Sequence, residues 1–168
     1  DEDTFIVLIT GPNTGGKTVS LKTAGLMVLM AQSGLHLPAV EAQLTAFENV
    51  FADIGDEQNI EARLSTFSAH MKRLKTVADM ATERSLVLLD ELGSGTDPSE
   101  GGALAMALLD HLRSLRCTTL VTSHLDLLKT YAHKHADIEN VSVEFDPRTH
   151  RPLYRLIYGL PGFSNALS

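Results

Sequence analysis

The chain has 168 residues, the size of one domain, and its 43% hydrophobic and 21% charged composition excludes both a disordered and a membrane-spanning protein. Its single cysteine excludes an internal disulfide framework and is typical of a reducing compartment. Because 21 acidic residues outnumber 14 basic ones, the net charge of −7 should repel a nucleic-acid backbone, so any anion must be held by a local site.

Neither end of the sequence carries a targeting signal. The chain opens at Asp1 without an initiator methionine, no signal peptide or transit pattern follows, and it closes at Ser168 after an apolar run. We therefore expect an excised piece of a longer cytoplasmic protein without membrane contact. A processed mature chain is the alternative.

The first two expected elements flank a glycine-rich turn. An apolar run at residues 5–9 predicts a strand buried on both faces, and a sparsely charged stretch at residues 17–31 predicts a well-buried helix. The turn between them fits the P-loop pattern G-x-x-x-x-G-K-[ST], with Gly11, Pro12, Asn13, Thr14, Gly15, Gly16, Lys17 and Thr18. This strand–loop–helix context predicts a nucleotide site; the alternative is a turn that merely precedes a helix.

The residue types of this loop suit a triphosphate. Glycines let backbone N–H groups converge on phosphate oxygens, and the N-terminus of the following helix adds about half a unit of positive charge. Lys17 would then reach the β- and γ-phosphates, and the Thr18 hydroxyl would bind Mg²⁺. The sequence thus predicts ATP and Mg²⁺ as the ligands.

A second strand and a second helix follow. The strand is expected at residues 50–54, and Ser65 is expected as the N-cap of a helix that runs to about Thr82. The apolar face of this helix would consist of Phe67, Met71, Leu74, Ala78 and Ala81. Its charged face would consist of Lys72, Arg73, Lys75 and Asp79.

Two carboxylates end the next apolar strand, residues 86–90. Asp90 at the carboxyl end of the strand could hold the magnesium shell, and the adjacent Glu91 could take a proton from the attacking water. Two exposed acids at a strand end are the alternative, because such an arrangement is common on surfaces. Behind a matched P-loop, the pair is interpreted as a Walker B strand with its catalytic base.

The third helix has a strong start signal, with Asp97 at the N-cap, Pro98 at the first position and Glu100 at the third. Its core stripe is expected to consist of Leu104, Leu108, Leu112 and Leu115. A buried strand at residues 118–122 follows and leads to His124. A neutral His124 imidazole could contact the γ-phosphate or the attacking water; a surface histidine beyond a strand is the alternative.

Strands that alternate with helices predict an α/β fold with a mainly parallel sheet flanked by helices. A short helix is expected at residues 126–135, and alternating strands at 141–145 and 153–158 predict a C-terminal antiparallel hairpin at the sheet edge. Cys117 is expected to be a small buried side chain. His133 and His135 would point to different faces of a helix, so zinc is not expected.

The P-loop, the Asp-Glu strand and the strand-end histidine, in this order, resemble the ABC-type ATPase superfamily. The transporter signature L-S-G-G-Q is absent; instead residues 53–58 (D-I-G-D-E-Q) lead to Ser65-Thr66-Phe67. This block resembles the MutS family of DNA-repair ATPases, in which Ser-Thr-Phe opens the signature helix. The resemblance covers essentially the whole chain and implies one ABC-type ATPase domain over residues 1–168.

Within that family, Thr14, residues 56–58 and residues 95–101 resemble the second bacterial branch, which is associated with suppressing recombination. The resemblance extends to residues 154–156 and 159–164. The DNA-clasping arms of the family lie upstream, and this branch usually carries a small nuclease domain downstream; the resemblance includes neither. It therefore implies that DNA is bound through other parts of the parent protein.

The resemblance also implies a second copy of the domain as a partner. ABC-type domains bind ATP between two copies arranged head to tail, so Ser65 would face the partner's γ-phosphate and the loop at residues 93–96 would cross the dimer seam. A helix N-terminus at that point favours an anion. The alternative is that Ser65 is an ordinary N-cap without a ligand.

Three functions are open at this point. The first is an ATPase and dimerisation domain that hydrolyses ATP slowly as a conformational switch. The second is a nucleotide-gated assembly module with negligible turnover in isolation. The third is another ABC-type ATPase of chromosome maintenance interrupted by a coiled coil, which is disfavoured because the run from Thr18 to Ser65 has no room for one. The sequence names no adenine contact.

Overall fold

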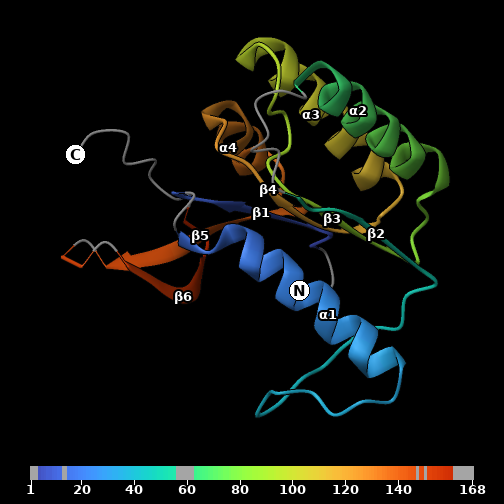
Figure 1. Cartoon of the computed structure of the whole chain (residues 1–168), viewed down its shortest axis with the longest axis vertical. Helices are drawn as coiled ribbons and strands as arrows, with labels where there is room; N and C mark the ends of the chain where they lie inside the picture. The colour runs from blue at the N-terminus through green and yellow to red at the C-terminus, as the bar shows by residue number, and fades with distance from the viewer. Residues whose placement is uncertain (1–3, 13–14, 56–62, 147, 150, 161–168) are drawn as a thin grey trace.

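Within the part of the chain that the structure describes, a six-stranded sheet carries helices on both faces (Figure 1). The computed structural model describes residues 4–12, 15–55, 63–146, 148–149 and 151–160, of which 63–67 are described by their backbone only. The strands are β1 (Ile6–Thr10), β2 (Asn49–Asp53), β3 (Ser85–Leu89), β4 (Thr118–Thr122), β5 (Ile138–Asp146) and β6 (Arg151–Tyr158). The helices are α1 (Lys17–Gln32), α2 (Arg63–Met80), α3 (Pro98–Ser114) and α4 (Asp126–His133).

The sheet is mainly parallel, with the strand order β2-β3-β4-β1-β5-β6. Neighbouring strands from β2 to β5 run parallel, and β5 pairs antiparallel with β6. The α/β class, the mainly parallel sheet and the C-terminal hairpin are therefore confirmed. Because the parallel strands point the same way, their carboxyl ends meet at one edge of the sheet, which is where open α/β sheets gather ligands.

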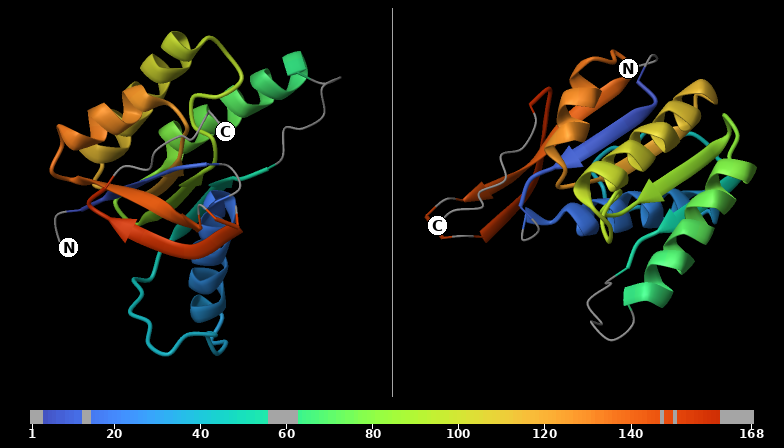
Figure 2. Two further views of the ribbon diagram at one scale, coloured as in Figure 1. Left: turned by 90° about the vertical axis from the view of Figure 1, so that its left-hand side faces the viewer. Right: turned by 90° about the horizontal axis from the view of Figure 1, so that it is seen from above.

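Side chains that alternate along the strands form a core on each face of the sheet. Val87 of β3 joins the core beneath α2, α3 and α4, whereas Leu88 of the same strand packs with Leu21 and Val28 of α1. Figure 2 shows the same division, with α1 on one face of the sheet and the other three helices on the opposite face. Each fully buried aliphatic side chain contributes about 1.5–3 kcal/mol, so these cores hold the carboxyl edge rigid.

Two expectations about helix faces are wrong. The helix α1 is not well buried, since Val19, Leu26 and Leu29 are 50%, 59% and 49% exposed and only the opposite stripe meets the sheet. In α3, Leu104 is 40% exposed, because the helix is rotated so that Ala105 faces the core instead. The strong apolar character of both segments concealed which stripe each helix buries.

The expected N-cap of α2 is also wrong. The helix begins at Arg63, so Ser65 lies inside its first turn. The two residues before Ser65, an arginine and a leucine, are good helix formers and extend the helix upstream. Leu74 and Ala81 are buried in the core as expected, whereas the side chains of Ser65 and Phe67 lie outside the described residues.

Smaller predictions about capping and burial are confirmed. The Asp97 carboxylate accepts a hydrogen bond of 2.9 Å from the Ser99 N–H and caps α3. Cys117 is buried, with its Sγ 3.4 Å from the Ser85 carbonyl oxygen. None of the helices in the described part of the chain combines the length and the apolar composition needed to cross a bilayer.

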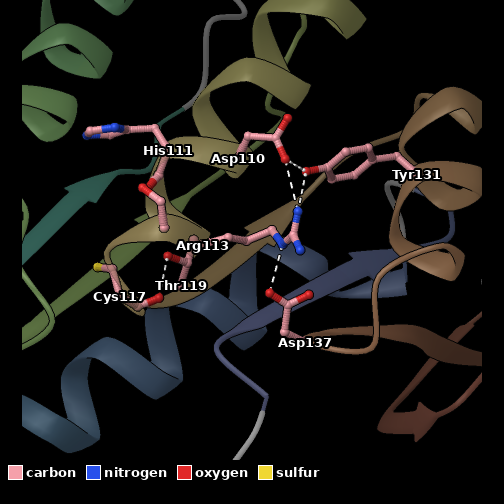
Figure 3. Close-up of polar contacts among 8 residues, drawn as sticks. Asp110, His111, Arg113, Cys117, Thr119, Tyr131 and Asp137 are labelled. Carbon is pink, nitrogen blue, oxygen red and sulfur yellow. Dashed lines mark hydrogen bonds and ion pairs between the residues drawn. The ribbon is translucent and has the colours of Figure 1, made fainter.

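A network of charged side chains ties α3 and α4 to the amino-terminal edge of the sheet (Figure 3). Arg113 donates to the carboxylates of Asp137 at 2.8 Å and Asp110 at 3.0 Å. The same guanidinium donates to the Tyr131 hydroxyl at 3.3 Å, and Tyr131 in turn donates to Asp110. These hydrogen bonds and ion pairs join α3 to α4 and to Asp137, the residue that precedes β5.

Candidate functional site

The described part of the loop from β1 to α1 contains two glycines in left-handed conformations. Gly11 and Gly16 have φ angles of +130° and +93°, which residues with a Cβ rarely adopt. Gly16 is the N-cap of α1 and supplies no side chain to its first N–H groups, and the first turn contains no acidic residue. Among the described residues of this loop, no side chain is seen to cap the helix, and a helix N-terminus favours an anion. Asn13 and Thr14 lie outside the described residues.

The C-terminal hairpin supports this loop from the side. A Cβ on Gly11 would lie 2.8 Å from Val143 Cγ2, and one on Gly15 would be closer still, so both glycines are required by close packing. The Tyr154 ring lies beside Gly16, within 3.1 Å of where a Cβ would be, yet Tyr154 is 69% exposed. The sequence analysis missed this tyrosine, because its only signal was an aromatic residue in an edge strand.

Lys17 is a buried cation at the start of α1. It is 2% exposed, and its Nζ donates a 2.6 Å hydrogen bond to the Gly11 carbonyl oxygen across the loop. Burial lowers the pKa of Lys17, while the nearby carboxylates of Glu91 and Asp90 act in the opposite direction and offset part of this effect. The ammonium therefore lies inside the loop, next to the two strand-end acids.

The residues expected to bind magnesium touch one another. The Thr18 hydroxyl donates a 2.7 Å hydrogen bond to Asp90 Oδ2, although the two residues are 72 positions apart in the sequence. The Thr122 hydroxyl donates to the other oxygen, Oδ1, at 2.5 Å. A carboxylate and a hydroxyl in contact are hard oxygen donors of the kind that Mg²⁺ prefers, so the side chains present fit this ion.

Glu91, which follows β3 and Asp90, has a strained backbone conformation. Its φ of +50° is left-handed, a conformation that costs a residue with a Cβ roughly 1–2 kcal/mol. Its N–H donates to the Thr122 hydroxyl at 2.8 Å, and the N–H of Leu92 donates to the Thr122 carbonyl at 2.9 Å. These bonds hold the turn so that the half-buried Glu91 follows Asp90 at the same edge.

The two remaining predicted site residues are His124 and Ser65, and only the side chain of His124 is described. His124 is exposed and lies just beyond β4, at the same edge of the sheet as the P-loop and the acid pair. Ser65 belongs to the first turn of α2, and its side chain lies outside the described residues. The structure therefore places Thr18 in contact with Asp90 and the Lys17 charge near Asp90 and Glu91, and it places His124 only at the same edge.

A buried ion-pair cluster beside this site was missed by the sequence analysis. Asp53 ends β2, and its carboxylate lies 2.5 Å from His70 Nδ1 and 2.5 Å from Arg73 Nε of α2. Burial alone would raise the pKa of Asp53, but the bonds from His70 and Arg73 outweigh burial and lower it. The Asp53 carbonyl also accepts from the Asp90 N–H at 2.9 Å. The sequence pattern that could have predicted this cluster is an acid at a strand end, Asp53, followed by His70 and Arg73, which are three positions apart and so share one helix face.

Comparison with known proteins shows the family to which the chain belongs. The profile of the family described as MutS domain V matches residues 7–159. The chain is 58% identical over 166 residues to "Endonuclease MutS2" of Alkaliphilus oremlandii, a match that covers 98% of this chain and 21% of the relative. Proteins of the same name match from Fusobacterium nucleatum (56% identity, 99% of this chain, 22% of the relative) and Staphylococcus haemolyticus (55%, 98% and 21%).

The match extends over almost all of this chain but over a small part of the relatives. The chain spans about a fifth of the length of these curated relatives, as the covered shares of 21% and 22% indicate. The family match includes the loop after β1, the acid pair after β3 and the residue His124 after β4. The chain belongs to the MutS domain V family.

Proposed function

We propose that this chain binds ATP with Mg²⁺ and hydrolyses it to ADP and phosphate. The observation that supports this most strongly is the 2.7 Å hydrogen bond between Thr18 and Asp90, which joins the glycine-rich loop to the strand-end acid. Buried Lys17 lies within the same loop and supplies the positive charge that a triphosphate requires. Lys17 and Thr18 open α1 and Asp90 follows β3, so the fold already holds these groups together before a phosphate ligand binds.

Each residue then has a chemical role. Lys17 and the loop amides neutralise the phosphates, and Mg²⁺ bound by Thr18 and Asp90 would supply charge stabilisation. Glu91 accepts a proton from the attacking water as the water oxygen bonds to the γ-phosphorus. The bond from that phosphorus to the bridging oxygen breaks, which gives ADP and inorganic phosphate. His124 would contact the γ-phosphate or the water.

Tyr154 is proposed as the stacking surface for the adenine base. Its ring is exposed and lies beside Gly16, where the loop passes into α1. Stacking of a base on an aromatic ring contributes about 1–3 kcal/mol. Tyr154→Ala should therefore weaken ATP binding about tenfold, while the affinity for inorganic triphosphate, which has no base, stays unchanged. Equal losses for both ligands in calorimetric titrations would exclude stacking.

The parent protein is proposed to act on DNA. This chain would be its ATPase and dimerisation domain, with ATP held between two copies arranged head to tail and Ser65 of one copy facing the γ-phosphate of the other. The relatives are named endonucleases, and DNA contacts would come from parts of the parent outside these 168 residues. We assign the parent to the branch that suppresses recombination and to the cytoplasm.

The test is turnover of the purified chain, compared with Glu91→Gln. Removing a general base costs on the order of a hundredfold in kcat, so the variant should be slower by about that factor while it still binds ATP. The exposed Glu83→Gln serves as the matched control. Equal, near-background rates for the unaltered chain and Glu91→Gln would instead favour a nucleotide-gated assembly module.

A further inference from the structure

The hydroxyl of Thr122 lies between the two strand-end acids. Thr122 is the last residue of β4 and is fully buried. Its Oγ1 donates to Asp90 Oδ1 at 2.5 Å and accepts from the Glu91 N–H at 2.8 Å. A threonine hydroxyl has one proton to donate, and here that proton is directed to Asp90. A single side chain on a neighbouring strand therefore contacts the carboxylate of Asp90 and the backbone N–H of Glu91.

The two oxygens of Asp90 are held from different sides. Oδ2 accepts from Thr18 of the P-loop, whereas Oδ1 accepts from Thr122 of β4. The Thr18 hydroxyl is itself a proposed metal ligand, whereas the Thr122 hydroxyl comes from β4 and would act on Asp90 without binding the ion. Partners of this kind fix the orientation of a metal ligand, and their loss commonly lowers metal affinity by about 10–100-fold.

Thr122 also holds the turn that carries Glu91. The left-handed φ of +50° at Glu91 needs support from its surroundings. That support comes from the N–H groups of Glu91 and Leu92, which donate to the hydroxyl and the carbonyl of Thr122 respectively. Loss of the hydroxyl removes the first of these bonds and leaves the second. The Thr122 hydroxyl therefore supports the backbone from which the Glu91 side chain projects.

We propose that Thr122 is a positioning residue that orients Asp90 for the metal ion and Glu91 for the attacking water. This inference rests on the proposed ATPase function. It predicts that loss of the hydroxyl impairs magnesium-dependent binding and turnover, while contacts of the nucleotide with the P-loop persist. A merely structural role in the core would instead lower stability without affecting the response to magnesium.

The test compares Thr122→Val, which keeps the shape but removes the hydroxyl, with Thr122→Ser, which keeps the hydroxyl. Thr119→Val is the matched control, because Thr119 is a fully buried threonine of the same strand whose hydroxyl donates to the Cys117 carbonyl at the opposite edge (Figure 3). Each purified chain is titrated calorimetrically with ATP, once with Mg²⁺ and once with EDTA, and steady-state turnover gives kcat and KM.

In Thr122→Val, the gain in ATP affinity on adding Mg²⁺ should fall about tenfold, and kcat should fall by at least the same factor. Its affinity in EDTA should stay within about twofold of the unaltered chain, because the loop amides and Lys17 are untouched. Thr122→Ser should restore both quantities to within about threefold, since it retains the donor. Thr119→Val should match the unaltered chain in both.

A Thr122→Val chain whose magnesium response and kcat equal those of Thr119→Val would overturn the inference. If Thr122→Val does not fold, as judged by circular dichroism, Thr122→Cys replaces it, because a thiol of similar size is only a weak donor and should give the same losses. Absence of magnesium-dependent ATP binding in the unaltered chain would overturn the proposed function itself, which separates the two failures.

Discussion

Asp53 and Asp90 show how neighbours decide what a strand-end carboxylate can do. Both acids follow parallel strands that lie side by side, and the Asp90 N–H donates to the Asp53 carbonyl. Asp53 contacts two basic side chains, His70 and Arg73, so its charge is compensated within the fold. The Asp90 carboxylate instead accepts hydrogen bonds from the hydroxyl groups of Thr18 and Thr122, and the Lys17 ammonium acts on it as a nearby charge. Asp53 is therefore suited to structure and Asp90 to a cation.

Replacing Asp53 by Asn should lower the free energy of unfolding at pH 7 by about 2 kcal/mol, because a buried pair loses its charge. The pKa of Asp53 is lowered below its ordinary value of 3.8, so the stabilisation is complete above that value and is lost as the pH falls through the folded pKa. Urea unfolding at a series of pH values should therefore show the difference between the two chains closing in acid.

The control for Asp53→Asn is Asp79→Asn. Asp79 pairs with Lys75 on the exposed face of α2, where its side chain is 59% exposed. Exposed pairs of this kind contribute about 0.3–0.5 kcal/mol, so this variant should differ little from the unaltered chain. Two results would contradict the role assigned to the cluster. The loss of unfolding free energy in Asp53→Asn could be as small as that in Asp79→Asn, or it could persist unchanged at low pH.

Single residues could be predicted from the sequence where their partners are fixed by local spacing. The P-loop and the adjacent acids are of this kind, since both follow an apolar strand within a few residues. Thr122, Tyr154 and the Asp53 cluster were missed, because their partners come from other strands and helices. Glu91 and Thr122 are 31 positions apart, and their hydrogen bond requires β3 and β4 to pair in register.

At the scale of elements, the first turn of α3 packs closely against the loop that follows the acid pair. A Cβ on Gly101 would collide with the carbonyl oxygen of Gly93, whose φ is +86°. A Cβ on the adjacent Gly102 would instead meet the end of the Leu127 side chain at 2.7 Å. Leu127 is 46% exposed and can move aside, whereas the backbone at Gly93 cannot.

Gly101→Ala should therefore lower the free energy of unfolding by about 2 kcal/mol, the usual range for overpacking, in spite of the better helix propensity of alanine. Gly102→Ala is the matched control, one residue further along the same helix. It should change stability by less than about 1 kcal/mol in either direction. Thermal denaturation of both variants measures the difference, and a Gly101→Ala chain at least as stable as the unaltered one would contradict this packing.

The elements themselves were easier to predict than their faces. The central strands β1 and β3 are short, mostly apolar runs, and the expected strands at residues 5–9, 86–90 and 118–122 agree with β1, β3 and β4 to within one residue. The burial of the outer face of α1 and of Leu104 in α3 was predicted wrongly, whereas Leu108 and Leu112 are buried as expected, since an apolar segment does not reveal where the buried stripe ends. The side of a helix that packs on the sheet depends on how the preceding loop orients the helix.

At the scale of the whole molecule, the net charge of −7 should keep this chain from binding DNA strongly. We expect no saturable binding of a DNA duplex at micromolar concentrations and physiological salt. Fluorescence anisotropy of a labelled duplex at two salt concentrations checks this. Tight, salt-sensitive binding would show that the chain has its own nucleic-acid surface and would contradict the proposal that DNA contacts lie elsewhere in the parent.

The most direct measurement for the whole account is a calorimetric titration of the purified chain with a non-hydrolysable ATP analogue in the presence of Mg²⁺. We expect binding by the unaltered chain and a loss of affinity of at least about a hundredfold in Lys17→Ala, since charged contacts to phosphate contribute strongly. Lys22→Ala, an exposed lysine on the same helix, should bind normally. Equal affinities of the unaltered chain and Lys17→Ala would contradict the assignment of the loop as a phosphate site.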